Sequence, residues 1–459
     1  MIEHIDRATE QAVSQGIRVL QTHYLDGGQR EHVLRLLKEM NPAQGAHIID
    51  AGSGIGEVSR IMAEVRPDLT FTLVNISEYQ LDLSPKGDQF HYWLADFADS
   101  KIPGACADIV MLNSALCQMQ INLALSEARR ILKGGGQLFV SDLALDEYRE
   151  IPDLFATFMP LEQWAGVIDR HGFEECSLAA FGEFDSSHFR DAMGAERFDS
   201  EFSSAIPFIG RFTKRTIEQH IDSVIGRHDR IALQFSGGKD SLAALHMLRK
   251  HWEKLTVYWL NTGDSVPEVL EVLGKIKPIV PNFVEVHGRV NEQIAQHGLP
   301  SDLVPTSSTP FGIGAFGGGI PLQDRFNCCF YSLMKPMHDR MEADGVTLII
   351  RGQKSADTMK AAIRSGAILG TIEFLFPAED MNDAEVFDWL EQNAFVPAYY
   401  NELSASPDCL TCSAYWSEGR ASWLKAKHPK AHASYQQKLD VIREAVMPHI
   451  ELFNLEVTP

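Results

Sequence analysis

Short apolar runs alternate with longer amphipathic segments along the chain. In the first half, helical spacing of apolar residues predicts a helix at 30–40 and a second helix that ends near Val65. The strands expected in this half are short apolar runs at 46–49, 69–74, 108–112 and 136–140. This alternation of strand and helix predicts a parallel sheet with helices on both faces.

A second series of the same kind follows in the other half. Its expected strands lie at 230–235, 255–260 and 347–350. A helix after the first of these strands should run to Lys250, and residues from 415 onward have the pattern of polar helices and a tail. We therefore expect an α/β fold with two doubly wound domains.

The boundary between the domains is expected where the pattern fades. The segment 184–214 mixes Asp, Ser and Phe without a clear period. We therefore assign 1–183 to the first domain, 184–214 to a linker and 215–459 to the second domain.

Composition adds bounds to this picture. The chain has 459 residues, of which 45% are apolar, and this length suits about two or three domains. No apolar run reaches the ~18 residues of a membrane span, and the N-terminus lacks the basic and apolar regions of a secretory signal. Seven cysteines are an odd number, which argues against a disulfide framework. We expect a cytoplasmic protein with no membrane contact.

The net charge of −21 does not suit a general polyanion binder. Basic residues nevertheless gather in two places, Arg351, Lys354, Lys360 and Arg364, and Arg420, Lys425, Lys427 and Lys430. Such clusters are typical of solvated helix faces and equally of local phosphate contacts. Binding to DNA or tRNA stays open on these clusters but is not favoured.

A glycine-rich turn joins the first predicted strand to the next helix. It reads Asp50-Ala51-Gly52-Ser53-Gly54-Ile55-Gly56. Glycines let the backbone approach a ligand closely, and a helix N-terminus favours negative charge. Asn75 ends the second strand, where its side chain can reach ribose hydroxyls. Asp96 follows a third candidate strand and can accept from an adenine amino group.

In this context, residues 25–183 resemble class I S-adenosylmethionine-dependent methyltransferases. The resemblance includes the late stretch Glu162-Gln163-Trp164 and His171-Gly172-Phe173. It implies that the turn that Asp50 opens binds S-adenosylmethionine, with Gly52, Gly54 and Gly56 at the methionine end and Asp96 at the adenine. Asn75 departs from the family, which usually has Asp or Glu there, and an amide bonds a ribose hydroxyl without charge assistance.

Two alternatives stay open for the first domain. One is a fold of this type that binds no cofactor, and the other is an NAD-binding Rossmann domain, whose loop reads GxGxxG where this one reads GxGxG. No methyl-acceptor base stands out, and His91, Tyr92, Tyr24 and His171 qualify by residue type only. A thiol acceptor would need little help from a base, because thiolates are nucleophilic near neutral pH.

The first strand of the second domain leads into the turn Ser236-Gly237-Gly238-Lys239-Asp240-Ser241. Backbone N–H groups in such a turn can hold an anion, and Lys239 can neutralise phosphate charge. The spacing differs from the GxxxxGK[ST] of Walker loops. It is similar to the PP-loop of ATP pyrophosphatases, which implies cleavage of ATP between its α- and β-phosphates. Lys239, Asp240 and Ser241 are then the catalytic candidates, and Ser236, Gly237 and Gly238 bind the nucleotide.

Further segments resemble the phosphoadenosine phosphosulfate (PAPS) reductase-like branch of that family over residues 215–416. The stretch from Trp259 to Glu268 looks like its nucleotide-base loop. Arg351-Gly352-Gln353-Lys354-Ser355-Ala356-Asp357 looks like its second phosphate-contacting segment, which makes Arg351 and Lys354 nucleotide-binding candidates. Gln353 stands where the family more often has Arg.

Four cysteines form an adjacent pair and a CxxC, at Cys328, Cys329, Cys409 and Cys412. Four thiolates suit an iron–sulfur cluster or zinc. Two adjacent cysteines rarely both fit one tetrahedral ion, whereas each corner of a [4Fe–4S] cube can take a different thiolate. The set resembles the cluster ligands of adenylyl-sulfate reductases, and Lys335 could place positive charge near it. Two buried thiols plus a disulfide are the alternative, although adjacent cysteines have poor disulfide geometry.

One departure separates the chain from sulfonucleotide reductases, which need a thiol nucleophile in a mobile C-terminal tail. No cysteine follows Cys412, and the remaining three, Cys106, Cys117 and Cys176, belong to the first domain. We therefore expect ATP with Mg²⁺ to activate a substrate oxygen as its adenylate, a sulfur donor to displace AMP, and S-adenosylmethionine to methylate the product.

The expected partners are a small-molecule substrate and a sulfur donor such as a persulfide protein, and a homodimer is left open. Two other functions stay open. The first is a reductase of adenylyl sulfate or PAPS that uses Cys117 or an external thiol from a thioredoxin-like partner. The second is a module that senses nucleotide and S-adenosylmethionine in a larger complex, for which Asn75 and Gln353 would be suited.

Overall fold

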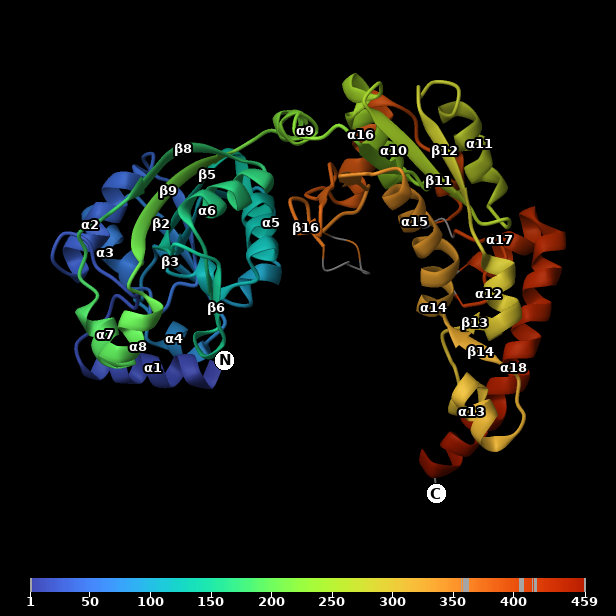
Figure 1. The fold of residues 1–459 in the computed structure, drawn as a ribbon, viewed down its shortest axis with the longest axis horizontal. Coiled ribbons are helices and arrows are strands. Elements are labelled where there is room, and N and C mark those ends of the chain that lie inside the picture. The colour runs from blue at the N-terminus through green and yellow to red at the C-terminus, as the bar shows by residue number, and fades with distance from the viewer. Residues whose placement is uncertain are drawn as a thin grey trace. The chain divides into compact units, whose positions relative to one another are not determined.

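The computed structural model describes residues 2–355, 357, 363–403, 408–414, 416 and 419–457. The chain forms two compact units (Figure 1). The first contains Met1–Val224 and Met359–Ile368, and the second contains Ile225–Thr358 and Leu369–Pro459. Each unit has its own sheet and its own buried apolar residues.

The first unit is built on a seven-stranded sheet in the order β3-β2-β1-β4-β5-β9-β8. Its strands are β1 (His47–Ala51), β2 (Thr70–Asn75), β3 (Phe90–Leu94), β4 (Ala107–Asn113), β5 (Leu132–Ala144), β8 (Phe173–Ala180) and β9 (Ile206–Lys214). The strands from β3 to β5 are parallel, and β9 lies antiparallel between β5 and β8. The carboxyl ends of β1, β2 and β4 therefore meet at one edge, where open α/β sheets bind their ligands.

Helices cover both faces of this sheet, because its parallel strands are apolar on both sides. α2 (Gln29–Met40) and α3 (Glu57–Val65) pack on one face, and α5 (Ile121–Ile131) and α6 (Leu161–Arg170) pack on the other (Figure 1). The other elements of the unit are α1 (Ile2–Ser14), α4 (Glu78–Asp82), η1 (Phe97–Asp99), η2 (Leu116–Gln118), β6 (Arg149–Ile151), η3 (Pro152–Leu154), β7 (Ala156–Phe158), α7 (Ser187–Met193), α8 (Ala195–Glu201) and α9 (Ile217–Ile225).

The second unit has a six-stranded sheet in the order β12-β11-β10-β15-β17-β16. Its strands are β10 (Ile231–Gln234), β11 (Leu255–Asn261), β12 (Phe283–His287), β15 (Leu348–Ile350), β16 (Ile368–Leu369) and β17 (Ile372–Leu375). The pairs from β12 to β17 are parallel. A separate parallel pair joins β13 (Leu299–Ser301) to β14 (Leu322–Asp324).

The helices of the second unit include α10, which begins at the glycine turn, and the long C-terminal α18. They are α10 (Lys239–Met247), η4 (Arg249–His251), α11 (Pro267–Ile276), α12 (Val290–His297), η5 (Thr306–Ser308), α13 (Pro310–Phe316), α14 (Arg325–Cys329), the π-turn η6 (Phe330–Met334), α15 (Lys335–Ala343), α16 (Asp383–Asn393), η7 (Ala398–Asn401), α17 (Arg420–Lys427) and α18 (Pro429–Val457). Among the helices in the described part of the chain, none combines the length and apolar composition that a membrane span requires.

The α/β class and the strands expected in both halves are confirmed, but the linker expected at 184–214 is wrong. This segment holds α7, α8 and β9, and β9 pairs with β5 from Thr213 to Ile206. The first unit therefore extends to Val224. The error arose because neighbouring strands on both sides stabilise β9, while the short helices before it have no clear amphipathic period.

Candidate functional site

The glycine turn of the first unit lies between β1 and α3. Gly52, Gly54 and Gly56 have φ of +79°, +54° and +68°, a conformation that residues with a Cβ rarely adopt. The Gly52 and Ser53 N–H groups donate to the Val74 carbonyl at 2.9 and 3.1 Å, which holds the turn against the end of β2. No side chain of these three glycines therefore covers the backbone at the carboxyl edge of the sheet.

Asp50, at the end of β1, faces the interior. The residue is 2% exposed, and its Oδ2 accepts from the Ser59 hydroxyl of α3 at 2.6 Å. Burial raises the pKa of Asp50 from 3.8 to about 7, and the Ser59 hydrogen bond opposes this shift. Asp50 was expected among the cofactor ligands, but the structure places its carboxylate in the core, where it ties β1 to α3.

Asn75, at the end of β2, holds the glycine turn. Its Nδ2 donates to the Gly54 carbonyl at 3.0 Å and to Gln80 Oε1 at 2.7 Å, while its Oδ1 accepts from the Ser77 N–H at 2.9 Å. Both donors of the amide are therefore used inside the protein, and one Oδ1 lone pair remains for a ribose hydroxyl.

Residues before β1 also reach this edge of the sheet. A Cβ added to Gly54 would lie 3.6 Å from Leu20 Cδ1. Gln21 Oε1 accepts from Asn113 Nδ2 at 2.9 Å, at the end of β4. Leu20 and Gln21 stand in an irregular segment without a motif, so no sequence signal could have identified them.

Asp96 lies beyond the end of β3 in an exposed position. Its Oδ1 accepts from the Ala98 N–H at 2.9 Å and caps η1. Because the residue is exposed, its carboxylate can still accept from the amino group of a ligand at this edge.

Two of the four candidate bases have structural roles. Tyr24 is 5% exposed, and its hydroxyl donates to the Val19 carbonyl at 2.7 Å. His171 is 1% exposed, with its Nδ1 2.8 Å from the Val167 carbonyl oxygen. Neither side chain is available to take a proton from a methyl acceptor in this conformation.

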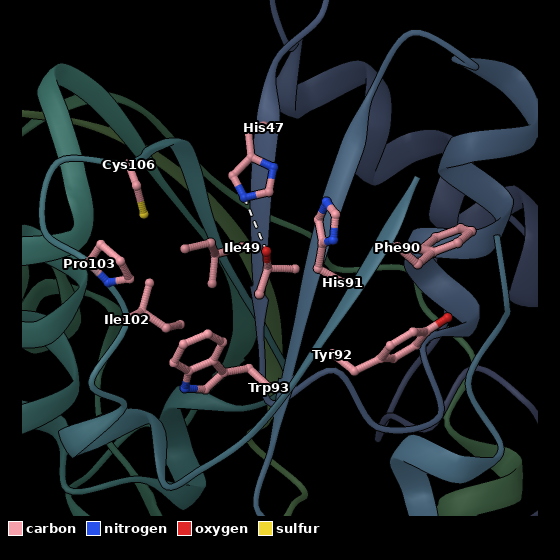
Figure 2. Close-up of a pocket in the computed structure, with 10 residues that line it drawn as sticks. His47, Ile49, Phe90, His91, Tyr92, Trp93, Ile102, Pro103 and Cys106 are labelled. Atoms are coloured by element: carbon pink, nitrogen blue, oxygen red, sulfur yellow. Dashed lines mark hydrogen bonds between the residues drawn. The ribbon is translucent and has the colours of Figure 1, made fainter. Parts of the chain in front are cut away.

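The other two candidate bases line a hollow of about 430 Å³ on the sheet beside β3 (Figure 2). The lining residues are His47, Ile49, Thr72, Phe90, His91, Tyr92, Trp93, Ile102, Pro103 and Cys106. His47 begins β1, whereas the glycine turn follows its end. The hollow therefore lies away from the carboxyl edge, and the structure identifies no methyl-acceptor base among the four candidates.

Cys117 is buried in the first unit against Asp142. Its backbone N–H donates to Asp142 Oδ2 at 3.1 Å. Burial, together with the Asp142 charge, raises the pKa of the Cys117 thiol well above its usual range. The thiol therefore stays protonated, which argues against Cys117 as the nucleophile that the C-terminal tail lacks.

In the second unit, the Ser236–Ser241 turn joins β10 to α10. Gly237 has φ of +82°, and a Cβ there would lie 2.7 Å from Val269 Cγ1. Ser236 Oγ accepts from the Gly238 N–H at 3.3 Å, and Tyr400 Oη accepts from the Lys239 N–H at 3.0 Å. Two backbone donors of this turn are therefore satisfied by hydroxyls of the protein itself.

Lys239 and Lys354 share a cluster of carboxylates. Lys354 Nζ lies 2.7, 2.8 and 3.2 Å from oxygens of Asp240, Asp357 and Asp383. Lys239 Nζ lies 2.8 Å from Asp240 and 3.0 Å from Asp383. Burial alone would lower the pKa of Lys354, but its hydrogen bonds to Asp240 and Asp357 raise it above its usual range. Asp383 was missed because it begins α16, far along the chain from both lysines.

The 351–354 segment lies directly against the start of α10. A Cβ on Gly352 would lie 2.3 Å from the Asp240 carbonyl carbon and 2.4 Å from the Ser241 nitrogen. Arg351 Nε and Gln353 Nε2 are buried and have no hydrogen-bond partner among the described residues. Both donors can therefore bond an acceptor that a ligand supplies.

All four cysteines of the second unit line one small cavity, together with Asp264, Val290, Ile294, Pro300, Arg325, Ser332, Leu333, Ser413 and Lys438. Cys328 and Cys329 come from α14, and Cys409 and Cys412 from the segment before α17. Burial and the thiols of Cys328 and Cys412 raise the pKa of Cys329 to about 12. Tertiary structure thus brings together the two pairs that sequence spacing left apart.

The basic side chains beside these cysteines are Arg325 and Lys438 rather than Lys335. Lys438 Nζ, from α18, donates to Thr411 Oγ1 at 2.7 Å and to the Thr411 carbonyl at 3.1 Å. Lys335 is exposed and pairs with Asp339 at 2.7 Å one helical turn away. The positive charge expected from Lys335 near the cysteines therefore comes from Arg325 and Lys438, which line the cavity.

Two family models match the chain. A methyltransferase domain matches residues 49–140, and a phosphoadenosine phosphosulfate reductase domain matches residues 230–393. The matched ranges contain the glycine turn of the first unit and the Ser236–Ser241 turn of the second.

Curated relatives match the first unit. An O-methyltransferase of Pyrenophora dematioidea is 26% identical over 150 residues, which cover 31% of this chain and 56% of the relative. An O-methyltransferase of Penicillium expansum is 30% identical over 120 residues, which cover 23% of this chain and 41% of the relative. The chain thus spans about half the length of these two relatives. A ubiquinone/menaquinone biosynthesis C-methyltransferase of Caulobacter vibrioides is 30% identical over 187 residues, which cover 31% of this chain and 73% of the relative.

Solved structures are also similar to part of the chain. The [4+2]-cyclase SpnF is 14% identical with a TM-score of 0.40, and the match covers 46% of this chain and 93% of that one. A geranyl diphosphate methyltransferase in complex with GPP and sinefungin is 10% identical with a TM-score of 0.39, and the match covers 46% of this chain and 98% of that one.

Proposed function

Because the chain belongs to the methyltransferase domain family in its first unit and to the phosphoadenosine phosphosulfate reductase domain family in its second, we propose that it is a bifunctional enzyme. The second unit uses ATP to introduce sulfur into a small molecule, and the first unit methylates the product. The observation that carries this proposal is that Cys328, Cys329, Cys409 and Cys412 line one cavity in the unit that also holds the Ser236–Ser241 turn.

The first unit is proposed to bind S-adenosylmethionine at the carboxyl edge of its sheet. The bare backbone at Gly52, Gly54 and Gly56 suits close approach of a ligand. Asp96 is exposed beyond β3, so its carboxylate can accept from the adenine amino group. When bound, S-adenosylmethionine supplies a methyl group on a positively charged sulfur, which a thiolate can attack without a protein base.

The second unit is proposed to bind ATP with Mg²⁺ at the Ser236–Ser241 turn. The unpartnered donors of Arg351 and Gln353 support an anionic ligand there. Lys239 and Lys354 would exchange part of their carboxylate contacts for phosphate oxygens, which neutralises the charge of the leaving pyrophosphate. Mg²⁺ prefers carboxylate and phosphate oxygens, and Asp240 and Asp383 supply such groups beside the turn.

The four cysteines are proposed to hold a [4Fe–4S] cluster rather than zinc. No three of their sulfur atoms lie within 4.8 Å of one another in the described chain. Four sulfurs at about 2.3 Å from one zinc ion would be only about 3.8 Å apart, whereas a cube with one ligand at each corner needs wider spacing. Such a cluster would hold four irons at the cavity, each bound by one cysteine thiolate.

The proposed reaction has three balanced steps. A substrate hydroxyl oxygen attacks the α-phosphorus of ATP and its proton passes to water. The bond between the α-phosphorus and the bridging oxygen breaks, and pyrophosphate leaves. Hydrosulfide attacks the carbon that carries the adenylate, AMP leaves with the C–O electron pair, and the new thiol loses a proton to water. The thiolate then attacks the methyl group of S-adenosylmethionine, and S-adenosylhomocysteine leaves.

The test supplies the full chain with ATP, sulfide, labelled S-adenosylmethionine and a panel of small hydroxyl- and carbonyl-bearing compounds. Methyl transfer that requires both ATP and sulfide, with one pyrophosphate released per methyl group, is the expected result. Methylation that proceeds equally well without ATP and sulfide would remove the coupling between the units.

A second candidate is reduction of adenylyl sulfate or PAPS, which the match of the second unit to the reductase domain favours. No cysteine follows Cys412, so a thiolate of a partner protein would attack the sulfonyl sulfur and displace the nucleotide. A second thiolate would then attack the sulfur of the partner protein, which forms a disulfide and releases sulfite. Sulfite release from either nucleotide with a reduced dithiol protein, and no need for ATP, would favour this reaction over sulfur transfer.

A further inference from the structure

Two tyrosines of η7 lie on the Ser236–Ser241 turn. The Lys239 N–H, the first donor of α10, is bonded to Tyr400 Oη at 3.0 Å. The Tyr399 hydroxyl donates to the Gly237 carbonyl at 3.1 Å. Tyr400 Oη also lies 3.2 Å from the position of a Cβ on Gly238. η7 thus covers this turn through contacts on both sides of Gly238.

The position of the Tyr400 hydroxyl is the one that an anion takes at a helix start. α10 has no side-chain cap from its own N-cap residue, Gly238, so the donors of its first turn are open to an outside acceptor. The phenol oxygen fills this place as a neutral acceptor, because a phenol is protonated near neutral pH. Burial raises the pKa of Tyr400 further. A phosphate oxygen carries charge, and hydrogen bonds to ionised acceptors are about twice as strong as neutral ones.

The surroundings hold Tyr400 in this place without the ligand. Phe387 of α16 contacts its ring edge-on with centroids 5.4 Å apart, and Lys239 Nζ lies 5.8 Å from both ring centroids. Tyr400 is half-buried, so the ring can leave without opening the core.

We propose that the Tyr400 hydroxyl occupies the position of a nucleotide phosphate while no nucleotide is bound. When a nucleotide binds, Tyr400 moves away and a phosphate oxygen accepts from the Lys239 N–H. Tyr400 therefore sets the affinity of the turn for nucleotide, since every bound phosphate must first break the tyrosine hydrogen bond. This inference rests on the nucleotide site proposed above and assigns it a competing residue of the protein itself.

The test measures binding of a non-hydrolysable ATP analogue with Mg²⁺ to the full chain by calorimetry. Y400F removes the competing acceptor and keeps the ring, so binding should become tighter by about fivefold, which corresponds to one neutral hydrogen bond. Y258F is the matched control, because its hydroxyl bonds Asp344 at 2.7 Å outside the turn. Y258F should bind the analogue within about twofold of wild type.

Hydrogen exchange supplies an independent measurement on the wild-type protein. Addition of the analogue should speed exchange in the peptide 398–403 and leave the peptide 236–245 protected. Equal or weaker binding by Y400F, or slower exchange in 398–403, would show that Tyr400 does not compete and would overturn this inference alone. If wild type and both variants bind neither the analogue nor pyrophosphate, the proposed nucleotide site itself is wrong, and the inference fails with it.

Discussion

At the scale of single residues, two predicted cofactor ligands make hydrogen bonds inside the protein. Asp50 accepts a hydrogen bond from Ser59 in the core, and Asn75 donates both of its N–H groups, to Gly54 and Gln80. Glycines at 52, 54 and 56 need such support, because a turn of residues with positive φ has little stability of its own. The shape of this edge therefore depends on hydrogen bonds of buried side chains.

Asp50 predicts how the stability of the first unit changes with pH. Its pKa is about 7 in the folded state against an ordinary 3.8, so the unfolded chain releases this proton first as pH rises. Stability should therefore fall between about pH 4 and pH 7, with the penalty fully present above pH 7. D50N keeps the acceptor for Ser59 and removes the charge. Its stability relative to wild type should rise with pH, by up to about 4 kcal/mol at pH 8.

Calorimetric unfolding of the full chain at several pH values checks this prediction through the transition of the first unit. D88N, at an exposed position, serves as the control and should follow wild type. A stability difference between D50N and wild type that stays constant from pH 4 to pH 8 would contradict a buried, protonated Asp50.

Asn75 predicts that the acid usual in the family would be harmful here. In N75D a carboxylate oxygen would replace Nδ2 opposite the Gly54 carbonyl at 3.0 Å, and two acceptors would repel each other. We expect a loss of about 1–3 kcal/mol in stability and weaker binding of S-adenosylmethionine. N75A, which removes the hydrogen bonds without adding charge, should be less affected. Tighter binding by N75D, measured by calorimetry, would instead mean that this side chain faces the ribose.

At the scale of elements, the candidate nucleotide site at the Ser236–Ser241 turn depends on how closely the segment after β15 approaches α10. The contact falls at Gly352, where any side chain would meet the Asp240 and Ser241 backbone. This approach brings Lys354 among the carboxylates of Asp240 and Asp383. Strand order explains it, because β10 and β15 are parallel neighbours and their carboxyl ends lie at the same edge.

Replacing Gly352 tests this contact. In G352A the new Cβ would lie 2.3 Å from backbone, which cannot move without shifting α10, so we expect a loss of about 3 kcal/mol and of nucleotide binding. G274A is the matched control, because Gly274 lies within α11 and a Cβ there meets nothing within 4 Å. G274A should raise stability by about 0.5–1 kcal/mol. Thermal unfolding and binding of the ATP analogue should be measured for both variants. Unchanged binding in G352A would mean that the 351–354 segment can move away from α10.

At the scale of the whole molecule, the chain joins two complete α/β units, and the cysteines divide between them. Cys106, Cys117 and Cys176 lie in the first unit, while the other four surround one cavity of the second. The basic residues of the two clusters differ in exposure. Lys354 and Arg420 are 1% and 2% exposed, and Lys360 lies outside the described residues. Lys425, Lys427 and Lys430, in contrast, are exposed. The choice of a small-molecule substrate over a nucleic acid therefore stays a prediction.

Because four cysteines surround one cavity of the second unit and the other three lie in the first unit, single substitutions should differ in their effect on metal content. Wild-type protein purified without oxygen should contain about four iron and four sulfide per chain and absorb visible light. C329S and C412S should lose most of this iron, because each removes one of four thiolate ligands. C176S, in the first unit, should retain it. Colourless wild-type protein that contains zinc would contradict the cluster and weaken the case for sulfur chemistry.

The sequence by itself determined the features that depend on near neighbours in the chain. Apolar runs predicted the main strands, and the glycines of both turns predicted tight backbone. The SGGKDS and cysteine motifs supplied candidate site residues, whose chemistry stays a prediction. These features follow from local sterics and from burial of apolar side chains, which act over a few residues.

Only the tertiary structure decided which distant residues meet. It brought Tyr400 to Lys239 across 161 positions, Asp383 to Lys354, and Cys409 and Cys412 to the pair on α14. It also paired β9 with β5 and buried Asp50. Such contacts arise when helices and strands pack, and the same local sequence is compatible with many packings, so the partners of each side chain are set by the complete fold.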